Sequence, residues 1–327
     1  MNTGAATGIA KIRPRLVYSP AYDIRLLGLE KLHPFDSCKY SRAWNVLVER
    51  FGDRLQQSTI IPTHPASMAM LQTIHTEAYL QQLTSSRHVA DALELASLAW
   101  VPCGLLDRQI LQAMRFATMG TVIAAQTALS MGIAINLSGG YHHASADRGE
   151  GFCVYADIAI AIAMLRQSAK IAVDDSIVII DLDAHQGNGL ARIFELDRSV
   201  HLLDMYNCEI YPQDSKAIAR LDGNLPLASN TRSAEYLDKL QHYLPIFLAG
   251  IDCPKIAFYN AGTDIYEHDP LGRLKVSAQG IGDRDRFVFQ TLVAVGIPTV
   301  MVLSGGYTRE SYQLVATSVA DVWETWG

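Results

Sequence analysis

Residues 176–189 read S-I-V-I-I-D-L-D-A-H-Q-G-N-G, and this stretch decides the fold. The run from Ser176 to Ile180 is short and rich in β-branched apolar residues, which is typical of a buried strand. The run ends abruptly in two aspartates, a histidine and a glycine-rich turn. A buried strand with polar residues at its carboxyl end indicates a parallel sheet that carries a site at the strand ends.

Three further segments have the same organisation. Strand-like runs at 132–137, 255–259 and 297–303 lead into S-G-G-Y-H-H, N-A-G-T-D and S-G-G-Y, which begin at residues 138, 260 and 304. Helical spacing of apolar residues is found at 40–51, 65–85, 108–130, 156–168, 233–249, 278–295 and 309–325. Alternating strands and helices predict an α/β fold whose mostly parallel sheet has helices on both faces. The four polar clusters are therefore expected at one edge of the sheet.

Asp181, Asp183 and His185 alternate along the chain after the first of these strands. If the backbone stays extended, alternate side chains point to one side, so two carboxylates and an imidazole converge. Burying such charges together is costly unless a cation compensates them. The ligand types suit zinc, and Mn²⁺ and Fe²⁺ are also compatible with them. Asp264 adds a third protein ligand and leaves a position open for water, as a catalytic zinc requires.

Each of these residues also has an ordinary structural interpretation. The D-x-D-x-H residues could be solvated loop residues, and Asp264 alone could be a helix N-cap. Adjacent histidines such as His142 and His143 are usually structural, but at a strand end they become candidates for acid and base catalysis. Tyr307 either packs or donates its phenol to a developing oxyanion. The shared strand-end position favours the catalytic interpretation.

The composition narrows the class of protein. The chain has 327 residues, of which 49% are hydrophobic and 18% charged, and this is ample for a large core. A formal net charge of −6 does not suit direct nucleic-acid binding. Five scattered cysteines without a CxxC pair argue against a disulfide framework, and no run approaches the roughly 20 apolar residues of a membrane helix. Without a signal-peptide pattern, we expect a cytoplasmic protein with a flexible lead-in over 1–15 and a single catalytic domain over 16–327.

Together these motifs resemble the histone deacetylase superfamily. The sequences G-G-Y-H-H, G-F-C, D-L-D-A-H-Q-G-N-G, N-A-G-T-D and S-G-G-Y occur in that family's order and approximate spacing. Three stretches resemble the class IV branch, namely G-L-E-K-L-H-P-F-D at 28–36, D-R-G at 147–149 and D-M-Y-N at 204–207. The resemblance implies an arginase-like, three-layer α/β/α fold with a mostly parallel central sheet of about eight strands.

The resemblance also implies a role for each matching residue. The family's zinc ligands match Asp183, His185 and Asp264. Its catalytic residues match His142, His143, Asp181, Asn188 and Tyr307. Its acyl-lysine tunnel matches Gly151, Phe152, Gly305 and Gly306. Its structural potassium ion matches Asp181, Asp183, His185, Asp204 and Met205.

In this assignment His143 is the general base and acid, and His142 is its electrostatic neighbour. Asp181 orients His142, and Tyr307 donates to the oxyanion. Asn188 departs from class I members, which carry an aspartate there. A neutral partner stabilises an imidazolium less than a carboxylate does, so we expect a lower pKa for His143.

The implied reaction is zinc-dependent hydrolysis of the amide of an acyl-lysine in a protein or peptide. The class IV resemblance implies a preference for long-chain acyl groups. An alternative on the same fold is an amidohydrolase of acetylated polyamines or similar small amides. A two-metal ureohydrolase is disfavoured because Gln186 stands where a further ligand is needed, and a non-catalytic acyl binder because no ligand or catalytic residue is missing. His75 is interpreted as a hydrogen-bonding histidine at a helix end, and Cys153 as a small buried hydrophobic residue.

Overall fold

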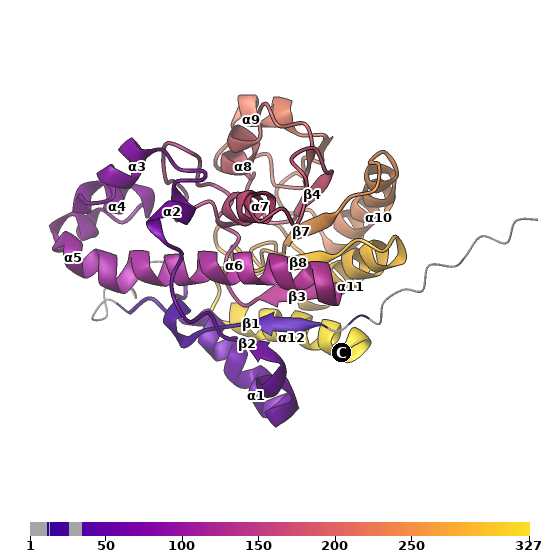
Figure 1. The fold of residues 1–327 in the computed structure, drawn as a ribbon. Helices are drawn as coiled ribbons and strands as arrows, with labels where there is room; N and C mark the ends of the chain where they lie inside the picture. The colour runs from indigo at the N-terminus through magenta and orange to yellow at the C-terminus, as the bar shows by residue number, and fades with distance from the viewer. Residues whose placement is uncertain (1–11, 13, 26–34) are drawn as a thin grey trace, which may run out of the picture.

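The computed structural model describes residues 12, 14–25 and 35–327 (Figure 1). In this part of the chain eight strands form one parallel sheet in the order β2-β1-β3-β8-β7-β4-β5-β6. The strands are β1 (Arg15–Val17), β2 (Thr59–Ile60), β3 (Ile133–Asn136), β4 (Ile177–Asp181), β5 (Val200–Asp204), β6 (Gly223–Asn224), β7 (Ile256–Asn260) and β8 (Thr299–Val302). The predicted α/β class and the parallel sheet are confirmed.

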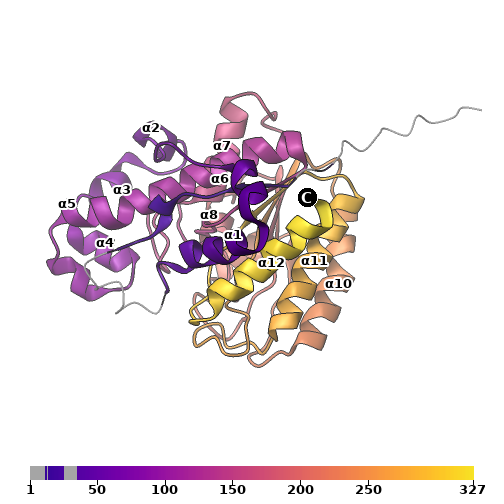
Figure 2. The same ribbon diagram turned by 90° about the horizontal axis from the view of Figure 1, so that it is seen from below.

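Helices cover both faces of the sheet. One face packs against α6 (Gln112–Met131), α7 (Asp157–Gln167), α8 (Asn188–Ile193) and α9 (Ser215–Arg220). The opposite face packs against α1 (Lys39–Ser58), α10 (Ser233–Ala249), α11 (Ala278–Ala294) and α12 (Ser311–Trp326), which form one layer in Figure 2. A helical lobe beside the sheet contains α2 (Met68–Leu71), α3 (Glu77–Gln82), α4 (Ser86–Ala92) and α5 (Cys103–Leu106). Shorter turns of helix are η1 (Pro20–Tyr22), η3 (Ala96–Trp100) and η4 (Asp107–Leu111).

Strand β4 shows how the sheet is held from both sides. Successive residues of a strand point to opposite faces. Ile177 and Ile179 pack into the hydrophobic layer of α6 and α7, whereas Val178 and Ile180 pack into the layer of α1 and α10–α12. All four side chains are buried, which explains why the strand is a continuous apolar run rather than an alternating one.

One predicted helix is wrong. The segment 65–85 contains two helices, because α2 ends at Leu71 and α3 begins only at Glu77. Thr76 starts the second helix, since its side-chain oxygen accepts a hydrogen bond from the backbone nitrogen of Tyr79 at 3.2 Å. Such a cap satisfies a free N–H group and fixes a new helix start.

The remaining boundaries differ by a few residues. The helix expected at 40–51 continues to Ser58 through a kink at Gly52, whose φ of 57° suits glycine. Strand β1 begins at Arg15, inside the expected lead-in. The rest of that lead-in, apart from residues 12 and 14, and most of the G-L-E-K-L-H-P-F-D stretch lie outside the described residues. Among the described helices, none combines the length and apolar character needed to cross a membrane.

Candidate active site

The four polar clusters meet because their strands are neighbours. Strands β3, β8, β7 and β4 lie side by side in this order, so the segments that follow them leave the sheet at the same edge. His142 and His143 follow β3, Tyr307 follows β8, and Asp264 follows β7. The loop after β4 supplies the remaining aspartate and histidine. The parallel sheet thus gathers residues that are far apart in sequence.

Asp183, His185 and Asp264 form a buried cluster with the geometry of a metal site. One ligand atom from each lies within 4.8 Å of the other two. His185 Nδ1 is 2.9 Å from Asp264 Oδ2 and 3.1 Å from Asp183 Oδ1, so the three groups face a common point. Burial next to Asp183 raises the pKa of Asp264 to about 7. A second negative charge is therefore unfavourable here without a cation, and two carboxylates with one imidazole suit zinc.

Two glycines leave room for these carboxylates. A Cβ atom on Gly262 would lie 2.8 Å from Asp183 Cγ. A Cβ atom on Gly305 would lie 2.6 Å from Asp183 Oδ2 and still closer to Asp264 Oδ2. The backbone nitrogen of Gly305 also donates to Asp183 Oδ2 at 2.9 Å. The glycines in N-A-G-T-D and S-G-G-Y therefore allow the close approach that places the ligand oxygens.

Asp181 is not part of this cluster, although it alternates with Asp183 in the sequence. Its Oδ2 is 2.8 Å from His142 Nδ1, and its Oδ1 accepts a hydrogen bond from Asn260 Nδ2 at 2.9 Å. Burial lowers the pKa of His142, but Asp181 and Asp183 outweigh it and raise this pKa to about 9. The arrangement favours a cationic His142.

His143 has a different environment from its neighbour. Its Nδ1 lies 2.7 Å from Asn188 Oδ1, and its ring is buried. Burial lowers the pKa of His143 well below its usual value, and the neighbouring His142 and His185 act in the same direction. The hydrogen bond with Asn188 acts in the opposite direction. A neutral His143 beside a cationic His142 suits a base that accepts a proton.

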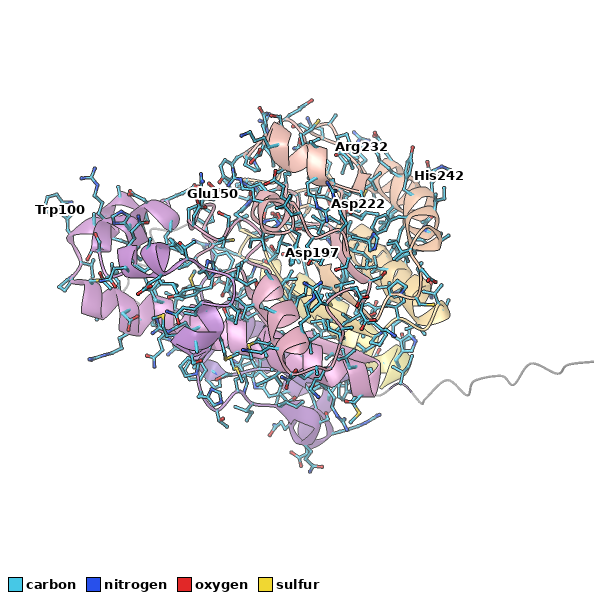
Figure 3. All side chains as sticks on the ribbon, turned by 45° about the horizontal axis from the view of Figure 1, so that its top comes forward. Trp100, Glu150, Asp197, Asp222, Arg232 and His242 are labelled. Atoms are coloured by element: carbon cyan, nitrogen blue, oxygen red, sulfur yellow. The ribbon has the colours of Figure 1, made fainter. Side chains whose placement is uncertain are left out.

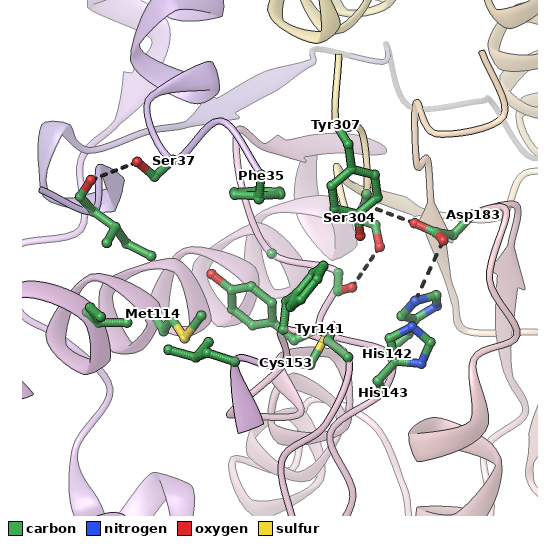
Figure 4. Close-up of a pocket in the computed structure, with 18 of the residues that line it drawn as sticks. Phe35, Ser37, Met114, Tyr141, His142, His143, Cys153, Asp183, Ser304 and Tyr307 are labelled. Carbon is green, nitrogen blue, oxygen red and sulfur yellow. Dashed lines mark hydrogen bonds and ion pairs between the residues drawn. The ribbon is translucent and has the colours of Figure 1, made fainter. Parts of the chain in front are cut away.

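Asp183, His142 and His143 line one end of a largely apolar cavity (Figure 4). Tyr307 and the histidine pair lie on its wall near Asp183. Of the residues predicted for the acyl-lysine tunnel, Gly151, Phe152 and Gly305 line the cavity. Gly306 does not, and it packs instead against Thr263 and Ser311. The Phe152 and Tyr307 rings are 5.9 Å apart. Away from the metal cluster the lining is largely apolar, and it includes Leu93, Leu95, Leu98, Ile110 and Met114.

Comparison with known proteins gives the family. The family model of the histone deacetylase domain matches residues 33–323. The chain belongs to the histone deacetylase family. Histone deacetylase 2 of Arabidopsis thaliana is 42% identical over 307 residues, which cover 94% of this chain and 78% of the plant protein. Because the chain belongs to this family and has the buried Asp–His–Asp set, it is a hydrolase with a zinc-type catalytic site.

Two solved structures have the same fold as this histone deacetylase family chain. The HDA15 HD domain matches with a TM-score of 0.74 at 21% identity, covering 95% of this chain and 90% of that one. A histone deacetylase homologue from Aquifex aeolicus matches with a TM-score of 0.73 at 21% identity, covering 95% and 84% of the two chains. At this level of identity the likeness concerns the fold alone.

The sequence analysis missed several residues that hold the site of this deacetylase-family protein. Asp157 at the start of α7 accepts hydrogen bonds from the backbone nitrogens of Gly140 at 3.0 Å and Tyr141 at 2.8 Å. Asp269 accepts from the backbone nitrogen of Tyr307 at 2.8 Å. Lys39 is fully buried and donates to the carbonyl oxygens of Ser304 and Gly305. For Asp157 the sequence did contain a signal, namely a charged residue directly before an apolar helical run.

Proposed function

We propose that this protein hydrolyses the amide bond of acyl-lysine with zinc held by Asp183, His185 and Asp264. One observation carries the proposal. Asp183 of the buried three-ligand cluster, two histidines with opposite pKa shifts and Tyr307 line the same end of an apolar cavity. The cavity provides a place for an acyl group, and the polar end provides the groups that amide hydrolysis needs.

Zinc, when bound, supplies Lewis acidity to the amide carbonyl and makes water a better nucleophile. In the proposed reaction His143 Nε2 accepts a proton from the attacking water as the new C–O bond forms. The phenol of Tyr307 donates to the oxygen on which negative charge develops. Burial raises the pKa of Tyr307, which keeps this donor protonated at neutral pH.

The second half of the reaction needs a proton at the leaving nitrogen. An amine leaves far more easily than its anion, so the histidine pair returns a proton as the C–N bond breaks. Asp181 keeps His142 cationic beside His143, and this positive charge compensates the negative charge that develops at the carbonyl oxygen. The products are a carboxylate and a free lysine amine.

We further propose a preference for long acyl chains, as in the class IV branch. The support is the apolar half of the cavity, which extends from the catalytic residues to Met114 on α6 (Figure 4). An acetyl group does not use this surface, whereas each additional methylene buried there contributes roughly 0.8 kcal/mol. Acetylated polyamines and other small amides are the competing substrate class.

A structural potassium ion beside Asp181 is also proposed. Asp204 pairs in register with Asp181 and accepts from the backbone nitrogen of Gly187 at 2.8 Å. Its second oxygen is buried and has no partner among the described residues. Met205 donates its backbone nitrogen to the Asp181 carbonyl oxygen at 3.0 Å. An unpartnered carboxylate oxygen beside another carboxylate is a reason to expect a cation.

The test is acyl release from matched lysine peptides that carry acetyl, octanoyl or myristoyl groups, with and without a zinc chelator. We expect chelator-sensitive turnover that is fastest with the longer chains. The Tyr307→Phe protein loses one oxyanion donor, so its kcat should fall by about 10²–10³. No turnover of any peptide by zinc-loaded protein would refute the acyl-lysine assignment, and turnover of acetylated polyamines in that case would support the competing class.

A further inference from the structure

Glu150 lies directly behind the Asn188 partner of His143. Its Oε1 accepts a hydrogen bond from Asn188 Nδ2 at 2.7 Å, and the same oxygen accepts from Arg192 Nη1. Arg192 in turn donates from Nε to Asp214 Oδ2 at 2.9 Å. Figure 3 shows Glu150 in the segment between the helical lobe and the region of α8 and α9. Neither zinc binding nor the lining of the apolar cavity requires a carboxylate at this position.

The backbone holds Glu150 in this position. Its nitrogen donates to the Cys153 carbonyl oxygen at 3.1 Å, and its carbonyl oxygen accepts from the Cys153 nitrogen at 2.9 Å. Gly151, the next residue in this turn, packs on the imidazole of His143 so closely that a Cβ atom would lie 2.8 Å from His143 Cγ. One tight turn therefore carries both the carboxylate and the surface on which the His143 ring rests.

This contact determines which way the Asn188 amide points. An ionised carboxylate is only an acceptor, so the group that Asn188 turns toward Glu150 must be its NH₂. The amide oxygen must then face His143. Because that oxygen is also only an acceptor, His143 Nδ1 must carry the proton and Nε2 must be free. A free Nε2 is what a general base requires.

We propose that Glu150 is a positioning residue that fixes the base-competent tautomer of His143 through the orientation of Asn188. The proposal deepens the proposed function and rests on it, since the tautomer matters only if His143 acts as the base. An aspartate in place of Asn188 would have two equivalent acceptor oxygens and would need no such partner. The Asn188–Glu150 pair thus does with two residues what a single carboxylate does alone.

Arg192 makes the loss of Glu150 more serious than the loss of one hydrogen bond. The guanidinium is only a donor, and it shares the Glu150 oxygen with Asn188. Without the carboxylate, the guanidinium that shared its oxygen is left facing Asn188, and a cation attracts the amide oxygen rather than the NH₂ group. The amide then turns its NH₂ toward His143 and favours the tautomer that is protonated on Nε2. That tautomer cannot accept a proton from water.

The first test is a double-substitution cycle on the zinc-loaded enzyme, measured with the best acyl-lysine peptide. Glu150→Ala should lower kcat at least about tenfold with KM within about threefold, as expected for loss of a residue that orients a catalytic group. Glu150→Gln keeps an acceptor oxygen and should retain more activity than Glu150→Ala. The matched control is Glu195→Ala, an exposed glutamate just after α8, which should leave kcat unchanged.

The second substitution of the cycle, Asn188→Asp, gives the decisive comparison. Alone, this substitution places a carboxylate against Glu150 and should lower kcat through like-charge repulsion. Combined with Glu150→Ala, the new carboxylate can accept from both His143 and Arg192, so the double variant should be more active than either single variant. A double variant that is less active than Glu150→Ala would overturn the proposal, as would equal kcat values for Glu150→Ala and Glu195→Ala.

A second readout does not depend on turnover. Long-range ¹H–¹⁵N spectra of zinc-loaded protein with ¹⁵N-labelled histidine report which ring nitrogen carries the proton, with His143→Ala to assign the signals. We expect His143 protonated on Nδ1 in the wild type and shifted toward Nε2 in Glu150→Ala. The same tautomer in both proteins refutes the role of Glu150. Inactivity of the wild type on every peptide would instead refute the proposed function, and the spectra would still decide about Glu150.

Discussion

Substitution of Gly305 by alanine tests whether the Asp–His–Asp cluster is a metal site. The new Cβ would lie 2.6 Å from Asp183 Oδ2, whereas ordinary van der Waals contact begins at 3.4 Å. The carboxylate oxygen must therefore move by 3.4 − 2.6 Å, or about 0.8 Å. Asp264 Oδ2 is closer still and must move as well. Ligand distances in metal sites vary by only about 0.2 Å, so displacements of this size should disrupt zinc binding.

The expected result is a loss of zinc affinity of at least about 100-fold, or about 2.7 kcal/mol. Competition with a chromophoric chelator measures this affinity, and circular dichroism in the presence of the chelator reports the fold. Gly104→Ala is the matched control, because a Cβ there meets nothing within 4 Å. Folded Gly305→Ala protein that binds zinc within threefold of the wild type would refute the reasoning.

Three further predictions concern the support of the site, its pH response and its cavity. Asp157→Asn turns an NH₂ group toward a backbone donor and should lower the free energy of unfolding by about 1–3 kcal/mol in denaturant titrations, and an unchanged midpoint would count against the assigned hydrogen bonds. Burial lowers the pKa of His75 to about 4, and its Nε2 accepts from the backbone nitrogen of Ala156 at 3.0 Å. In the unfolded state the histidine has its ordinary pKa of about 6.5, so on acidification it takes up a proton before the folded state does. The stability that neutral His75 contributes is therefore complete above about pH 6.5 and is lost as the pH falls toward 4. The stability difference between wild type and His75→Gln should therefore shrink by about 2 kcal/mol from pH 7.5 to pH 5, whereas a constant difference would contradict it. Met114→Trp fills the far end of the cavity and should reduce myristoyl-lysine turnover at least about tenfold with acetyl-lysine turnover within about threefold, and equal losses on both substrates would argue against this path for the chain.

The strands that carry the site could be predicted because they are buried on both faces. A doubly buried strand such as β4 is a continuous apolar run, and its end is marked by a sudden change to polar residues. Strands β2 and β6 have two residues each and lie at the sheet edges, so they leave no pattern in the sequence. Strand β5 reads V-H-L-L-D, and its histidine interrupts the apolar run.

The sequence could place the candidate ligands and catalytic residues near one another because they belong to motifs that follow strand ends. Their supporting partners could not be placed in this way, because a hydrogen bond across the fold leaves no local signal. Glu150 and Asn188 are 38 residues apart in sequence, and so are Asp269 and Tyr307. The sequence also did not show which carboxylates approach Gly262 and Gly305 closely. The class IV assignment and the cytoplasmic location remain predictions.

The most direct test of the central claim is a zinc titration of metal-free protein while deacylation is followed. The account predicts that activity rises in proportion to added zinc and reaches its plateau at one equivalent per chain. Asp264→Ala protein, prepared in the same way, should bind zinc weakly and stay inactive through the titration. Full activity of the metal-free protein, or an active Asp264→Ala protein, would contradict the account.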